Sequence, residues 1–164
     1  SPSGNTPNST DGIELITNGD FNTNSDWTVQ TNYSQTIQNG QLSLLRNGSN
    51  AEGTAQSINT VIGSTYKVIY NVVSVSGGYP RIYVGTTEDS DDVATLILST
   101  GQGESSFTAT ASTSWIHPSV AGSTTGNITF SKISVQKVLS QNGNLDLLSY
   151  VFLSIPDLEL TTLS

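Results

Sequence analysis

The chain has 164 residues and a formal net charge of −8 at pH 7, with 5 Lys and Arg residues against 13 Asp and Glu residues. This shortage of positive charge excludes a protein that follows the phosphate backbone of nucleic acid, and it argues against docking on anionic membranes. No apolar run approaches the ~20 residues of a membrane span, so we expect no membrane insertion. The chain has no Cys, which excludes disulfides, thiolate metal sites and a Cys nucleophile.

Three regions follow one another along the sequence. Residues 1–12 are rich in Ser, Pro, Gly and Asn, which predicts a flexible arm or linker. Residues 13–138 contain short stretches of Val, Ile, Tyr, Thr and Leu separated by Asn-Gly and Gly-Gly turns, with no helical period. Strands at intervals of about 8–12 residues predict an all-β domain, a two-sheet antiparallel β-sandwich. The predicted strands are 13–16, 28–37, 41–46, 54–58, 65–76, 80–86, 93–99, 106–111, 114–120 and 127–138.

The third region, residues 139–164, is an apolar C-terminal extension that is dense in Leu and Ile and contains no Lys or Arg. Two further strands, 145–154 and 158–163, would complete the core of the same domain. Alternatively, the extension docks on a neighbouring subunit through its apolar side chains, or it begins a further domain. The candidate assembly residues are Leu145, Leu147, Tyr150, Phe152, Ile155 and Leu158.

No catalytic constellation emerges from the sequence, and we expect the protein not to be an enzyme. The single histidine, His117, would have to serve any Ser–His–Asp triad, and no Gly-x-Ser-x-Gly turn is present. We therefore expect His117 to lie at the surface or at a strand end. No pair of carboxylates stands out as a glycosidase pair. Four glutamates are expected near turns: Glu14, Glu52, Glu88 and Glu104.

Oxygen-bearing side chains alternate between Asp20 and Asp26, which is how a calcium loop presents its ligands. Asp20 and Asn22 are the weak candidates for a Ca²⁺ site. The alternative is an Asx-rich turn in which the side chains bond to their own backbone. The acidic cluster 88–92 has the same two interpretations, a solvated loop or a surface Ca²⁺ site. No other cofactor is expected.

Aromatic residues beside polar partners are the remaining chemical resource, since sugar rings stack on flat aromatic faces. Tyr79, Arg81 and Tyr83 alternate along one predicted strand and therefore share one face. We expect both tyrosines to be partly exposed, and Trp115 is a fourth candidate for glycan binding. The other large aromatic residues are expected to pack in the core: Trp27, Tyr66 and Tyr70.

The opening strand carries a family resemblance. Residues 14–21 read ELITNGDF and are followed by Ser25-Asp26-Trp27, which resembles the opening of carbohydrate-binding modules of families 4, 9 and 22. Segments 63–68, 107–115 and 126–138 resemble later strands of that family in the same order. The variant that this chain resembles most is found in bacteriophage tail-fibre and virion appendage proteins. In the family the closing strand usually carries an acidic pair where this chain has Ser131 and Lys132, which weakens the calcium interpretation.

The resemblance implies a jelly roll over residues 13–138 and two functional hypotheses. The first is a non-catalytic jelly-roll protein on a virion or cell surface that recognises a glycan. The alternative is a purely structural assembly subunit without a ligand. The implied partners are a host-surface glycan, other virion subunits or further copies of the chain in a homo-oligomer. The implied location is the virion surface or the extracellular space.

Overall fold

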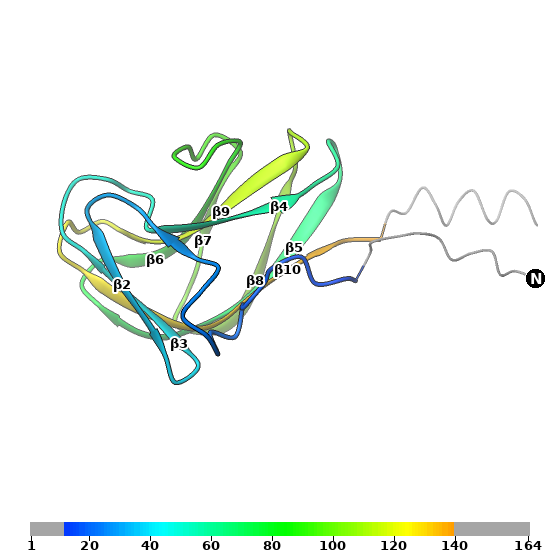
Figure 1. Cartoon of the computed structure of the whole chain (residues 1–164). Coiled ribbons are helices and arrows are strands. Elements are labelled where there is room, and N and C mark those ends of the chain that lie inside the picture. Colours follow the sequence, from blue (N-terminus) through cyan, green and yellow to red (C-terminus); the bar gives the residue numbers. More distant parts are fainter. Residues whose placement is uncertain (1–11, 140–164) are drawn as a thin grey trace, which may run out of the picture.

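Two antiparallel sheets of five strands each pack face to face in the computed structural model, which describes residues 12–139 (Figure 1). The prediction of an all-β sandwich is confirmed. Residues 12–139 form no helix, so none in this range has the length and apolar character needed to cross a membrane. The expected N-terminal arm and almost all of the C-terminal extension, including its six candidate assembly residues, lie outside the described residues.

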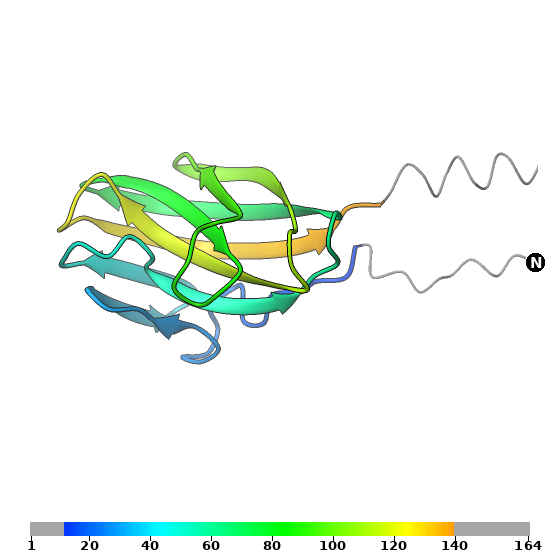
Figure 2. The same cartoon turned by 90° about the horizontal axis from the view of Figure 1, so that it is seen from above.

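Each sheet mixes strands from distant parts of the chain. The first sheet has the order β1 (Thr28–Val29), β4 (Thr54–Asn59), β9 (Thr113–Ala121), β6 (Tyr79–Gly85) and β7 (Ala94–Ile97). The second has the order β2 (Tyr33–Gln38), β3 (Gln41–Arg46), β10 (Asn127–Lys137), β5 (Thr65–Ser76) and β8 (Gly101–Thr108). Figure 2 shows the two layers from above, with residues 12 and 139 at the same end of the sandwich.

The core lies between β5 and β10 of the second sheet and the inner face of the first. Along β5, Tyr66, Val68, Tyr70 and Val72 alternate inward as the sequence predicts. In β10 the register against β5 shifts between residues 129 and 132, which marks a β-bulge. The shift changes the phase of alternation within one strand. Four residues of β10 therefore point inward: Ile128, Phe130, Ile133 and Val135.

The Asn39-Gly40 hairpin is the turn whose conformation follows most directly from its residue types. Both residues have positive φ, 55° and 73°, and Gln38 pairs with Gln41 across the two-residue loop. This conformation suits Asn-Gly because a Cβ at the second position would be strained there. The turn fixes the register of β2 against β3.

Several predicted elements are wrong in detail. The single strand predicted over 28–37 is divided by a turn at Asn32, and its halves, β1 and β2, belong to different sheets. The stretch 13–16 makes only an isolated bridge between Glu14 and Gln136. The strand predicted over 127–138 ends one residue early, at Lys137, and Val138 is 40% exposed.

Strand β8 also departs from the strand predicted over 106–111, since it begins at Gly101 and ends at Thr108. Its first half carries no apolar alternation that the sequence could reveal. Gly103 lies opposite Tyr70, and a Cβ there would overlap the tyrosine ring. Glu104 consequently lies within an edge strand rather than near a turn.

Two polar side chains tie the second sheet to β9. The Tyr33 hydroxyl lies 2.9 Å from the Ala51 carbonyl oxygen and accepts the Val120 N–H at 3.0 Å. The Arg46 guanidinium donates to the carbonyl oxygens of Val120 at 2.8 Å and of Ser49 at 2.8 Å. Both side chains are almost fully buried, and together they hold residues 49–51 against β9.

We expect Tyr33→Phe to lower the free energy of unfolding by about 1–3 kcal/mol, because it leaves the buried Val120 N–H without its acceptor. Urea unfolding followed by far-UV circular dichroism measures this change. Tyr79→Phe is the matched control, since Tyr79 is exposed, and it should shift stability by no more than about 0.5 kcal/mol. Equal effects of the two substitutions would contradict the role assigned to the Tyr33 hydroxyl.

Candidate binding surface

Three side chains of β6 project from the outer face of the first sheet. Tyr79, Arg81 and Tyr83 alternate with the buried Pro80, Ile82 and Val84, so they point away from the core. Tyr79 is 59% exposed, and Arg81 and Tyr83 are partly exposed. The Arg81 guanidinium carbon lies 5.6 Å from the centre of the Tyr79 ring, within cation–π distance. We call these three residues the β6 row.

The end of the β6 row at Tyr83 is polar and partly shielded from water. Burial raises the pKa of the Tyr83 hydroxyl above its usual value. Arg81 and Arg46 oppose this change, while the carboxylates of Asp91 and Glu52 add to it. The phenol is therefore neutral at physiological pH and can donate a hydrogen bond. The sequence did not connect Glu52 or Asp91 with Tyr83, because the path of the loops that carry them is not a local pattern.

The loop between β6 and β7 folds back over the outer face of the first sheet (green in Figure 1). We call residues 86–92 of this loop the strap. Ser90 lies directly on Gly85, where any Cβ would overlap its carbonyl group. The Glu88 carboxylate accepts a hydrogen bond from the Gln30 side chain at 3.3 Å, on the far side of the sheet. The acidic cluster is therefore only in part the solvated loop that the sequence predicts, since Glu88 and Ser90 are half-buried.

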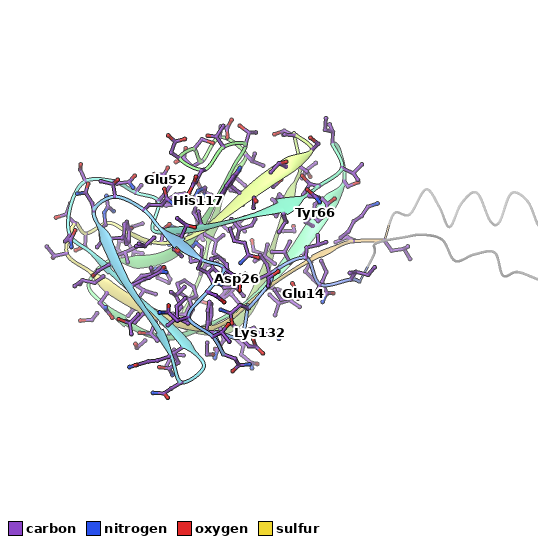
Figure 3. All side chains as sticks on the ribbon, viewed as in Figure 1. Glu14, Asp26, Glu52, Tyr66, His117 and Lys132 are labelled. Atoms are coloured by element: carbon purple, nitrogen blue, oxygen red, sulfur yellow. The ribbon has the colours of Figure 1, made fainter. Side chains whose placement is uncertain are left out.

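His117 lies beneath the strap, and the expectation of a surface or strand-end imidazole is wrong. It occupies the middle of β9 and is 0% exposed, although its position faces outward. Its Nε2–H donates to the Glu88 carbonyl oxygen at 2.7 Å, and Nδ1 lies 3.3 Å from the Tyr83 carbonyl oxygen. Both partners are backbone groups, an arrangement that orders a loop rather than activating a nucleophile. His117 is labelled on the first sheet in Figure 3.

Hydrogen bonds within the strap hold its shape. Asp92 accepts the Thr86 N–H and the Thr86 hydroxyl, both at 2.8 Å, and the Ser90 hydroxyl at 2.9 Å. These bonds to its charged form lower the pKa of Asp92 below its usual value. The strap is consequently an ordered cover.

Trp115 lies on the same outer face but on the other side of the strap. In the register of β9 against β6, Trp115 lies opposite Gly85, whereas the β6 row lies opposite Ala121, Ser119 and His117. Trp115 lines a separate hollow of about 330 Å³ together with the polar side chains of Asp26 and Ser57. The structure thus brings three of the four predicted glycan-binding residues together and separates the fourth.

The Asp20 region forms an Asx-rich turn. The Asn18 side chain donates to the carbonyl oxygens of Thr23 and Ser25 at 2.6 and 2.9 Å, and Asn22 donates to the Asp20 carboxylate at 3.0 Å. Lys132 lines the same hollow as Asp20. Among residues 12–139, no three acidic, His or Cys side chains gather as a metal site would require. Calcium binding by Asp20 and Asn22 remains a prediction.

No protein-family model and no curated protein sequence matches the chain. Solved structures share its fold. A structure described as "CBM4 structure and function" has a TM-score of 0.54 at 16% identity and covers 74% of this chain and 99% of its own. The enzymatically active domain of tailspike protein 4 from bacteriophage CBA120 has a TM-score of 0.53 at 14% identity, over 77% of this chain and 22% of its own.

A third similar structure is a family 29 carbohydrate-binding module, a CBM29-2 mutant complexed with cellulohexaose. Its TM-score is 0.50 at 12% identity, and the match covers 79% of this chain and 92% of that one. At these identities the likeness establishes the fold, a jelly-roll β-sandwich. It assigns no ligand.

We expect Asp92 to stabilise the fold in a pH-dependent way. Its pKa is lower in the folded state, so its contribution is fully present above the unfolded value of about 3.9 and is lost as pH falls through the lower folded pKa. The free energy of unfolding of the wild type should exceed that of Asp92→Asn at pH 6, and the difference should shrink below about pH 3.9.

Chemical denaturation between pH 2.5 and 7 tests this expectation. Asp89→Asn, in the same loop, is the control, since Asp89 accepts only the Thr87 hydroxyl at 3.1 Å. A wild-type advantage over Asp92→Asn that stays constant with pH would show that the carboxylate charge contributes nothing.

Proposed function

We propose that the protein is a non-catalytic jelly-roll module that recognises a glycan through the β6 row, on a virion surface or in the extracellular space. The observation that carries this proposal is the arrangement of the row. Tyr79 and Tyr83 present aromatic rings on an exposed sheet face, and the Arg81 guanidinium lies over the Tyr79 ring. Rings of this kind cover the apolar faces of sugars, and adjacent polar groups bond to the hydroxyls.

The charged groups at the Tyr83 end of the row are suited to hydrogen bonding with sugar hydroxyls. Arg81 supplies donors, and Glu52 and Asp91 are the carboxylates whose charges act on the neutral Tyr83 hydroxyl. The net charge of −8 disfavours acidic polysaccharides, so neutral glycans are the proposed class. The shared fold with structures named as carbohydrate-binding modules supports the proposal. The purely backbone environment of His117 supports the absence of catalysis.

Alanine substitution of Tyr79 or Tyr83 should lower glycan affinity about tenfold or more, as truncation of an aromatic anchor typically does. A glycan array with the full chain identifies the ligand, and isothermal titration with that ligand measures the affinities. Gln102→Ala, on the exposed face of β8 in the second sheet, is the control and should bind as the wild type does. An array without any bound glycan, or affinity that survives both tyrosine substitutions, would refute the β6 row as the site.

A second candidate function is a structural subunit of a virion, and one surface favours it. Large apolar residues are exposed at the end of the sandwich where residues 12 and 139 lie. Backbone hydrogen bonds join Gly12 to Lys137 and Val138 to Thr65, beside the turn at residues 61–64. The exposed residues are Ile13, Val61, Ile62, Val138 and Leu139. We call them the apolar end.

The apolar end leads directly into the extension that carries the candidate assembly residues, so we propose it as the contact between copies of the chain. The similarity to a tailspike domain supports a virion context. Other virion subunits are the alternative partners. Neither hypothesis requires a cofactor.

The double substitution Ile62→Asp with Leu139→Asp should dissociate oligomers of the full chain, because it places charge in an apolar contact. Light scattering during gel filtration measures the mass. Ile97→Asp is the control, since Ile97 is an exposed apolar residue of β7. A wild-type chain that is monomeric at high concentration would exclude this contact.

A further inference from the structure

The outer face of β9 is unusual because its middle is closed to solvent. His117 and Ser119 point outward by alternation with the core residues Ile116 and Val120, yet both are 0% exposed. Two different segments cover them. The strap lies over His117, and residues 52–53 lie over Ser119.

Contacts anchor the strap at both of its ends. At β6, Ser90 lies on Gly85, and at β9 the imidazole of His117 donates to the Glu88 carbonyl oxygen. Beyond β9, the Glu88 carboxylate is bonded to Gln30, which follows β1. The strap therefore crosses the sheet from one side toward the other.

The second cover is held just as firmly. The Gly53 N–H donates to the Ser119 hydroxyl at 2.8 Å, and the Gly53 carbonyl accepts the Gln30 N–H at 3.0 Å. Ala51 is held by the buried Tyr33 hydroxyl. Gln30 thus contacts both covers, through its side chain and through its backbone.

These covers bound the β6 row on two sides. From Tyr79 to Tyr83 the row extends about 13 Å along the strand. On β9, the residues opposite Tyr83 and Arg81 are His117 and Ser119, which the strap and Gly53 cover. Along the strand direction, a glycan that stacks on both rings can leave only past Tyr79, because Ser90 lies over Gly85, the next outward position after Tyr83. Toward the edge strand β7 the face is open, since Thr95 and Ile97 are exposed there. The hollow beside Trp115 lies beyond the strap and does not continue the path.

We propose that the strap determines specificity by making the β6 row a closed-ended site. Such a site binds the ends of neutral glycans or short oligosaccharides and not the interior of long chains. This inference rests on the proposed glycan function. The chemistry at the closed end agrees with it. A terminal sugar carries a free hydroxyl where an internal sugar has a glycosidic bond, and the strap at the closed end carries an exposed acceptor for such a hydroxyl, the carboxylate of Asp91.

The test uses the full chain and four neutral probe series, the cello-, xylo-, malto- and laminari-oligosaccharides of two to six units. Isothermal titration measures affinity against length. Two variants open the strap to different degrees: replacement of residues 87–91 by two glycines removes it, and Gln30→Ala removes only the side-chain bond to Glu88. Gln41→Ala, at an exposed position in β3, is the matched control for the second variant.

His117 provides a readout that does not depend on any glycan. It is the only histidine of the chain, so diethyl pyrocarbonate modification reports on a single imidazole. The wild type and Gln41→Ala should be protected, and strap removal should accelerate modification by about tenfold or more, as expected when a buried group becomes accessible. Circular dichroism of each variant confirms that the sandwich is intact. If strap removal prevents folding, Gln30→Ala serves in its place, because it loosens the strap by removing only the side-chain bond to Glu88.

For the wild type, affinity should reach a plateau at short length, with less than about a twofold gain up to six units. Opening of the strap should make affinity rise with length. Wild-type affinity that keeps rising with length, or tight binding to a polymer with blocked ends, overturns the closed-ended site while leaving the glycan function intact. Rapid modification of His117 in the wild type also overturns it, because the strap would then not cover the sheet. Absence of binding to every probe and to the array overturns the proposed function, and this inference with it.

Discussion

The packing of the β5–β10 pair against the opposite sheet is the constraint on which the remaining structure depends. These two strands lie side by side at the centre of the second sheet and carry most of its inward apolar side chains. A continuous apolar face along β10 requires the bulge near Phe130, because strict alternation would turn either Ile128 or Ile133 toward solvent. The bulge lets one strand cover the length of the core, and the first sheet packs on that surface.

Polar contacts between the layers then determine what the outer face of the first sheet presents. Tyr33 and Arg46 extend from the second sheet to the backbone of β9 and fix residues 49–51. This anchor places Glu52 and Gly53 over Ser119. His117 fixes the strap from the same strand. Buried groups of β9 thus position the loops that form the outer surface of the first sheet, and these loops cover the middle of β9.

The same arrangement links the binding proposal to the fold. The β6 row is open because no loop crosses it, whereas the adjacent strand is covered in its middle. The charges of Glu52 and Asp91, on two different loops, act on Tyr83, and the guanidinium comes from the row itself. Such a site has donors, acceptors and ring faces within a small area. The apolar end lies at a different place in the molecule, so glycan recognition and assembly can coexist.

The sequence by itself determined the features that depend on local periodicity. Period-two alternation predicted the sandwich, the inward face of β5 and the shared face of Tyr79, Arg81 and Tyr83, because strand side chains alternate whatever the strand packs against. Asn39-Gly40 predicted its hairpin because few other residues adopt that backbone conformation. The structure alone decided the features that depend on segments distant in sequence. The first half of β8 escaped recognition because Tyr70, on another strand, fills the space above Gly103. The burial of His117, the separation of Trp115 from the β6 row and the approach of Glu52 and Asp91 to Tyr83 all follow from loops that fold over the sheet, and no local pattern records where a loop will lie.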